Sequence, residues 1–239
     1  MKVELEAGTD AATLCLFGPA ALPDGFDRMA GEQKVDVLLQ MDKSGQVCWI
    51  NTGSDGGYLL HIYVDEPMPE ELAQYARDPR IVKGFPVTTG RLCFSGSEYV
   101  FRKDDAALRR FSHMGESATV RSGTYVATLY RMDYPETLLD ERFRAEVGDM
   151  EARIHGLHGC LAAIAVVMVA IGLISLVAST VALSFGFWLT FVLPGVVAAV
   201  LLPVLIGFLP VYRRANRQYL LLERQLPSIV AEMVFARPI

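Results

Sequence analysis

The feature that most constrains this chain is a run of 59 residues, between Arg153 and Arg213, without a lysine, arginine, aspartate or glutamate. A helix on a soluble core needs a polar face toward water, so it does not explain a charge-free run of this length. One membrane span takes about 20 apolar residues. The run is therefore too long for one span and fits two spans with a short turn between them.

The first span is expected at about residues 158–181 and the second at about 187–211. The predicted turn is Ser184-Phe185-Gly186, and the aromatic residues Phe187 and Trp188 beside it suit a membrane–water interface. Neither span contains an acid, a lysine, an arginine or an amide side chain. Ion pathways usually carry ionisable groups inside the membrane, so the pattern disfavours a transporter.

Arginines flank both ends of the predicted hairpin, whereas its turn has none. Arg153 precedes the first span, and Arg213, Arg214 and Arg217 follow the second. The positive-inside rule then places both ends in the cytoplasm. The N-terminal segment, residues 1–6, lacks the apolar core of a secretory signal, which agrees with this orientation. We expect an integral protein of a bacterial inner membrane with cytoplasmic N- and C-termini.

Apolar positions at helical spacing lead into and out of the hairpin. They indicate helical stalk segments that either pack on each other, pair with another copy of the chain, or, for the tail, lie along an anionic membrane surface. Pro227 is expected to kink the second segment. The positions are Leu139, Phe143, Val147, Met150, Ile154 and Leu157 before the hairpin, and Tyr219, Leu222, Leu226, Ile229 and Met233 after it.

The N-terminal part of the chain is rich in β-branched and aromatic residues between turn-forming residues, which favours a mostly antiparallel sandwich or an open barrel. Short helices are predicted at Pro69–Arg77 and Asp104–Phe111. Hairpin turns are predicted at residues 42–45 and 51–57. The predicted strands are Lys2–Glu6, Thr13–Phe17, Lys34–Gln40, Gln46–Asn51, Tyr58–Val64, Gly90–Phe94, Glu98–Phe101 and Thr124–Met132.

The sequence thus predicts an α+β membrane protein in four parts. A β-rich soluble domain, residues 1–133, is followed by an amphipathic connecting helix, 134–157. The two-helix transmembrane hairpin, 158–212, and a basic amphipathic tail, 213–239, complete the chain. Residues 1–155 hold 17 basic and 25 acidic side chains. An acidic surface repels phosphates, which argues against a nucleic-acid partner.

No residue pattern predicts a catalytic, cofactor-binding or metal site. The four cysteines are far apart and form no C-x-x-C pair, so they are expected to be buried apolar residues. The loop Gly53–Gly57 lacks the lysine of a phosphate-binding loop, and Ser95 lacks the frame of a nucleophile elbow. Two isolated histidines, His61 and His113, are expected to be structural. His155 and His158 at the membrane entrance could sense pH.

The layout resembles that of accessory and effector proteins of bacterial defence and interbacterial-competition systems. The leading hypothesis is a membrane-anchored, non-enzymatic binding or regulatory protein, such as an immunity or sensor protein, whose head recognises a protein partner. The alternative is a pore-forming effector whose hairpins assemble into a homo-oligomer. An anchored enzyme that uses His61 and His113 is a third hypothesis. Tyrosines that could contact a partner are Tyr58, Tyr63, Tyr75, Tyr99, Tyr125, Tyr130 and Tyr134.

Overall fold

A computed structural model describes residues 1–181 and 188–237, and these form two compact units. The first unit comprises Met1–Tyr134 together with Leu226–Ile239, and the second comprises Pro135–Gln225. The predicted turn residues Ser184, Phe185 and Gly186 lie outside the described residues. The expected combination of a β-rich N-terminal region with two long apolar helices is confirmed.

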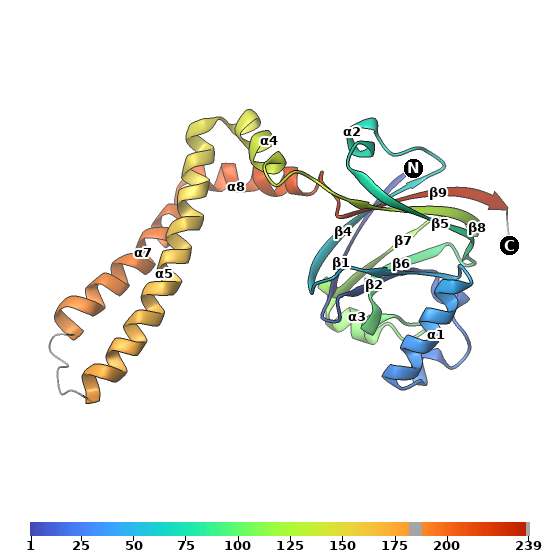
Figure 1. Cartoon of the computed structure of the whole chain (residues 1–239), viewed down its shortest axis with the longest axis horizontal. Helices are drawn as coiled ribbons and strands as arrows, with labels where there is room; N and C mark the ends of the chain where they lie inside the picture. The colour runs from blue at the N-terminus through green and yellow to red at the C-terminus, as the bar shows by residue number, and fades with distance from the viewer. Residues whose placement is uncertain (182–187, 238–239) are drawn as a thin grey trace. The chain divides into compact units, whose positions relative to one another are not determined.

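Two β-sheets form the first unit (Figure 1). All neighbouring strands are antiparallel except β4 and β9, which are parallel. In sheet order, the five-stranded sheet contains β1 (Lys2–Thr9), β4 (Gly56–Val64), β9 (Ile229–Arg237), β8 (Gly123–Met132) and β5 (Ala76–Val87). The four-stranded sheet contains β3 (Val47–Asn51), β2 (Thr13–Phe17), β6 (Arg91–Gly96) and β7 (Gly115–Thr119).

The two sheets enclose one hydrophobic core. Alternate residues of β8, beginning with the fully buried Tyr125, point into this core, as the two-residue period of a strand requires. Phe94 of β6 and Phe85 of β5 are also fully buried there. The T-shaped contact of Tyr125 with Phe235, 5.5 Å between ring centroids, joins β8 to β9. The core therefore depends on residues from both ends of the chain.

A second hydrophobic cluster covers the outer face of the four-stranded sheet. Helix α1 (Gly31–Lys43) and the 3₁₀ turn η2 (Phe26–Arg28) place Leu38 and Phe26 against Phe17 of the sheet. The predicted strand Lys34–Gln40 is wrong because it lies within α1. The buried residues of α1, Leu38 and Met41, are three positions apart, which is a helical spacing. Consequently residues 42–45 end a helix instead of forming a hairpin turn.

Other local predictions also need correction. Glu98–Phe101 is no strand, since it overlaps the 3₁₀ turn η3 (Ser97–Tyr99). Residues 51–57 connect strands of different sheets and so form no hairpin. The predicted helix at Pro69–Arg77 is short, because α2 (Glu70–Ala73) gives way to β5. The predicted helix at Asp104–Phe111 is present as α3 (Ala106–Arg110).

The most consequential correction concerns the C-terminal tail. Residues Ile229–Arg237 form β9, a central strand between β4 and β8, where a helix was expected. A spacing of four places Ile229 and Met233 on one helix face, but it equally places them on one face of a strand. Both point into the core. Residues 226–239 therefore belong to the first unit, whereas the sequence suggests a separate tail beginning at residue 213.

The second unit consists of helices α4 (Leu138–Val147), α5 (Asp149–Val181), α7 (Leu193–Phe208) and α8 (Pro210–Glu223), with a π-helical segment η5 (Trp188–Val192) before α7. Gly148, with φ of +92°, separates α4 from α5, so the expected connecting helix is interrupted. Two helical stretches, Asp149–Val177 and Trp188–Phe208, are long and apolar enough to cross a membrane. In the most apolar 18-residue segment of each stretch, only 11% and 6%, respectively, is buried.

The stalk segments α4 and α8 contact each other within one chain. Phe143, Ala215 and Leu222 are buried in a small hydrophobic cluster, and the rings of Phe143 and Tyr219 meet edge to face at 5.2 Å. Gln218 also donates a hydrogen bond to Glu146. These contacts agree with packing of the two segments on each other within one chain.

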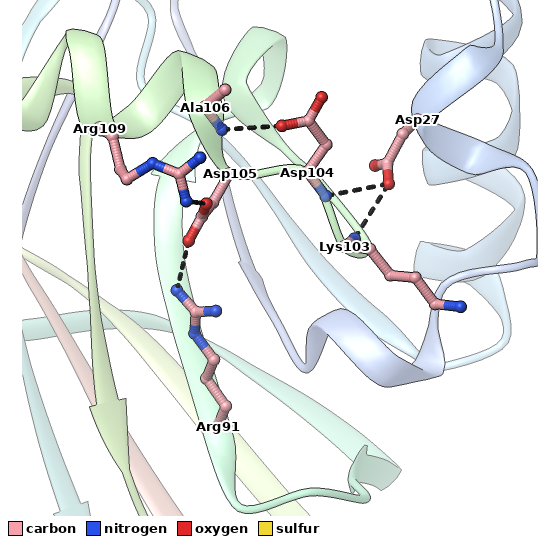
Figure 2. A network of polar contacts seen from close by, with 7 residues as sticks. All are labelled: Asp27, Arg91, Lys103, Asp104, Asp105, Ala106 and Arg109. Atoms are coloured by element: carbon pink, nitrogen blue, oxygen red, sulfur yellow. Dashed lines mark hydrogen bonds and ion pairs between the residues drawn. The ribbon is translucent and has the colours of Figure 1, made fainter.

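Within the first unit, a polar network joins the loop between η3 and α3 to η2 (Figure 2). The Asp27 carboxylate accepts backbone N–H bonds from Arg102, Lys103 and Asp104 at 2.7, 2.9 and 3.2 Å. Burial opposes ionisation of Asp27, but these three donors outweigh it and lower the pKa of the carboxyl group. Nearby, Asp105 accepts bonds from Arg91 and Arg109. The network therefore has a structural role: it fixes the position of this loop.

We predict that Asp27→Asn destabilises the first unit by about 1–2 kcal/mol at neutral pH, since hydrogen bonds to a charged acceptor are stronger than those to a neutral one. A lowered folded pKa contributes stability above the unfolded value of about 3.9 and loses it as the pH falls through the folded value. The difference in unfolding free energy between the parent and Asp27→Asn should therefore shrink below about pH 4. Denaturant unfolding at several pH values measures it, with the exposed Asp36→Asn as control. An unchanged difference at low pH contradicts the assignment.

The central position of β9 yields a second prediction. Met233→Ala should destabilise the first unit by about 2–5 kcal/mol, because it leaves a cavity at a fully buried side chain. Val234→Ala on the other face of the strand, where the side chain is 58% exposed, should cost less than about 1 kcal/mol. Unfolding followed by Trp49 fluorescence in a Trp188→Phe background measures both. Equal effects would contradict the assigned register.

Candidate functional site

A cavity of about 600 Å³ opens in the first unit where several strands begin or end. Ligand sites for small molecules span about 300–1,000 Å³. Its floor is apolar: Leu129 and Ile229 from the five-stranded sheet are each 5% exposed and belong to the core, and Ile50 of β3 packs against the same core. The cavity thus extends the hydrophobic interior to the surface.

One aromatic side chain of the lining, Tyr58, packs with this floor and is half-buried. Its hydroxyl donates a hydrogen bond to Ser54 O at 2.8 Å, which fixes the ring. Trp49, Tyr130 and Tyr134 also belong to the lining, but their side chains pack in other hydrophobic clusters. A rigid aromatic face beside an apolar floor suits a planar ring of a ligand.

One wall of the cavity is closed by a side chain that bridges the two sheets. β3 and β5 are edge strands of different sheets, and Arg80 of β5 reaches β3. Its Nη2 lies 2.6 Å from Asp42 Oδ1, and its Nη1 donates to Trp49 O at 2.8 Å. The same Asp42 oxygen accepts Trp49 N–H at 2.7 Å. This charged bridge joins the two edges beside the cavity.

A β-bulge in β5 precedes Arg80. The register with β8 shifts between Arg77 and Arg80, and Asp78 has φ of +51°, an uncommon conformation for a residue with a side chain. Bulges re-aim the side chains that follow them and are frequent next to binding sites. Here the bulge brings Asp78 and Arg80 into the same lining.

Arg131 and Asp78 place opposite charges in the exposed part of the lining. Arg131 pairs in register with Ile229 and follows Leu129 by two residues, so its position is on the inward face of β8. On the neighbouring strand β5, Arg77 pairs with Arg131 and Asp78 comes next. The two charges therefore lie on adjacent strands at the opening.

The cavity lining also includes both points at which the chain leaves and re-enters the first unit. Tyr134 follows β8, and Leu226 and Ser228 precede β9. A backbone hydrogen bond joins these two segments, from Met132 N–H to Ser228 O at 3.1 Å, and Ser228 N–H donates to Leu59 O of β4 at 2.9 Å. A molecule in the cavity would contact both connections to the helical unit.

The cysteines supply no reactive nucleophile at this site. Burial raises the pKa of the Cys48 thiol to about 12, against the opposing influence of Arg80. Burial likewise raises the pKa of Cys93 to about 11 and that of Cys15 well above its usual range. These three side chains are fully buried, as expected, whereas Cys160 on α5 is exposed.

The other polar residues noted in the sequence are not brought together at this cavity. His61 is 1% exposed with its Nε2 3.6 Å from a Glu4 oxygen, and His113 lies in the 3₁₀ turn η4 (Ser112–Met114). Ser95 donates to Gly96 O at 3.0 Å. Within residues 1–181 and 188–237, no three His, Cys, Asp or Glu side chains are grouped to hold a metal ion.

In the second unit the structure places the predicted membrane-flanking arginines on exposed positions of two helices. Arg153 lies on α5, whereas Arg213, Arg214 and Arg217 lie on α8 and line a shallow groove of about 450 Å³. The Arg213 guanidinium lies 5.2 Å from the centre of the Phe208 ring. His155 stacks on Tyr219 at 4.7 Å and lies 3.2 Å from Asn216 Oδ1.

Comparisons with known proteins identify no family for the chain. No family model matches it, and no curated protein matches it. Among solved structures, a chain described as "Crocagin biosynthetic gene J" is similar over 63% of this chain and 85% of that chain, with 14% sequence identity and a TM-score of 0.37. A likeness this low carries no functional inference.

Sequence reasoning found part of this site. Tyr58, Tyr130 and Tyr134 are among the tyrosines expected to contact a partner, and they line the cavity. The charged residues Asp42, Arg80 and Arg131 were missed because they lie far apart in the sequence and no motif surrounds them. The signal that could have found Arg131 is a charge on the inward face of the predicted strand Thr124–Met132.

The bridge between the sheets gives a third prediction. Arg80→Met should destabilise the first unit by about 1–2 kcal/mol, a value discounted because the Arg80 side chain is 40% exposed. It should also increase proteolysis at β3, since that edge loses its link to β5. Lys83→Met, at an exposed position of the same strand, should stay within about 0.5 kcal/mol of the parent. Equal stability of both variants would contradict a role of the bridge.

Proposed function

We propose that this protein is a membrane-anchored, non-enzymatic binding protein of the sensor or regulatory kind. Its first unit lies at the cytoplasmic face of a bacterial inner membrane, and the hairpin of the second unit is the anchor. The observation that carries the proposal is the junction of these parts. A folded unit with a ligand-sized cavity is interrupted, within the lining of that cavity, by a helical insertion that contains the 59-residue charge-free run.

The exposure of the apolar helices supports the anchor. Side chains such as Val166, Ile174 and Leu205 are 71%, 70% and 62% exposed. Apolar surface of this extent is unfavourable in water and is typical of a membrane or protein contact. A helix satisfies its own backbone hydrogen bonds, which makes it suitable for lipid.

The topology of the first unit supports a hairpin with two crossings. Strand β9 pairs with β4 and β8, so the residues before and after the insertion belong to one folded body. One body lies on one side of a membrane, which requires an even number of crossings between residues 134 and 226. Two spans meet this requirement. The exposed arginines on α5 and α8 favour the cytoplasmic side.

Packing inside the hairpin favours an anchor over the alternative of an oligomeric pore. A Cβ atom on Gly172 of α5 would lie 2.8 Å from Val196 of α7, and Gly195 lies against Met168. The Trp188 indole donates to Gly172 O at 3.0 Å. Small residues thus serve contacts between the two helices of one chain. Recognition of a protein partner by the head, as an immunity protein would require, stays a prediction.

The fourth prediction tests the orientation. In a Cys160→Ser background, single cysteines are placed at Glu32 on α1 and at Ser184 in the predicted turn. An impermeant maleimide should label the Ser184→Cys variant in intact cells, and the Glu32→Cys variant only after the membrane is opened. The protein should also stay in the membrane fraction at alkaline pH. A soluble protein, or labelling of Glu32→Cys in intact cells, overturns the proposal.

Dye release from vesicles separates the anchor from the pore. The full chain, reconstituted at increasing protein-to-lipid ratios, should release no more dye than vesicles that hold an unrelated two-span protein. Release that rises steeply with the ratio would support the pore.

A further inference from the structure

We infer that the cavity of the first unit binds a free aromatic α-amino acid, a small zwitterion with a planar ring. The inference rests on the proposed function in one respect, that the first unit is the binding part of the protein. The ring would lie on the apolar floor beside Tyr58. The carboxylate would pair with Arg131 and the ammonium group with Asp78.

The size and lining of the cavity fit the ring. A volume of about 600 Å³ accommodates one aromatic amino acid. The exposed positions of Arg131 and Asp78 place the polar end of the ligand toward the opening. Ile50, Leu129 and Ile229 offer an apolar surface for one part of the ring. The ring of Tyr58, held by its hydroxyl hydrogen bond, provides a fixed face for stacking.

The charges in the lining select a zwitterion. Four ionised side chains line the cavity, and the Arg80–Asp42 pair at 2.6 Å neutralises two of them. The other two, Arg131 and Asp78, have no ion-pair partner among the described residues. One positive and one negative group on adjacent strands match the carboxylate and ammonium groups of one amino acid. A simple anion or cation would leave one of the two charges without a counterion.

Binding would also reach the helical unit through the connections in the lining. A ligand ring in the cavity contacts Tyr134, where the chain leaves the first unit, and Leu226, where it returns. Ordering these two segments reduces local opening of the Met132–Ser228 hydrogen bond. The amide groups of residues 132–134 and 226–229 should therefore exchange more slowly with the ligand present.

The fifth prediction tests the ligand class on the full chain in lipid nanodiscs. In the Trp188→Phe variant, Trp49 is the single tryptophan and lines the cavity, so its fluorescence reports binding. Titration with L-phenylalanine should saturate. 3-Phenylpropionate, which lacks the ammonium group, and 2-phenylethylamine, which lacks the carboxylate, should each bind about ten-fold more weakly or worse. L-Leucine, with both charged groups but no ring, should also bind about ten-fold more weakly.

Charge substitutions then assign each end of the ligand. Arg131→Gln should weaken L-phenylalanine binding by about ten-fold and remove its advantage over 2-phenylethylamine. Asp78→Asn should remove its advantage over 3-phenylpropionate. Lys103→Gln, an exposed position of the same unit, should change neither. Because all three positions are exposed, unchanged unfolding midpoints should show that the variants fold.

Two outcomes overturn the inference. One is the absence of saturable L-phenylalanine binding to a folded chain in the membrane. The other is binding that Arg131→Gln and Asp78→Asn leave unchanged, or that L-leucine matches. Either result leaves the cysteine-labelling pattern intact, so it does not touch the anchor. Conversely, a soluble protein that still binds L-phenylalanine would overturn the anchor alone.

Discussion

The structure depends on the backbone ladder of β9, which pairs with β4 on one side and with β8 on the other. Without β9 both neighbours would become unpaired edges in the middle of a sheet, and the core would lose Ile229, Ala231 and Met233. The first unit is therefore completed by a segment that follows the helical unit in the chain. The helical unit is synthesised before the five-stranded sheet can close.

For the proposed membrane anchor, this connection limits the number of crossings. An insertion between two adjacent antiparallel strands must begin and end at one place, and the hydrogen bond from Met132 to Ser228 marks that place. A single span or three spans would separate β8 from β9 by a bilayer. The sheet thus restricts the insertion to an even number of crossings, a restriction independent of the arginine distribution.

The cavity has its origin in incomplete closure between the two sheets. Backbone pairing would fill the space between the edge strands β3 and β5, but the Arg80 side chain joins them instead. A side-chain bridge spans a wider gap than a backbone ladder, whose strands lie about 4.8 Å apart. The same gap exposes the inward face of β8 beyond Leu129 and places Arg131 at the opening.

The sequence by itself determined what depends on local composition. The apolar helices follow from an absence of charge, and Thr13–Phe17 and Thr124–Met132 follow from short runs of apolar, β-branched and aromatic residues between turn-forming residues. Only the tertiary structure decided what depends on distant partners. Leu38 and Met41 became helical against Phe17, and residues 229–237 became a strand because β4 and β8 offered unpaired backbone groups. Asp42, Arg80 and Arg131 meet at one cavity for the same reason: strand pairing, and no local pattern, sets which residues become neighbours.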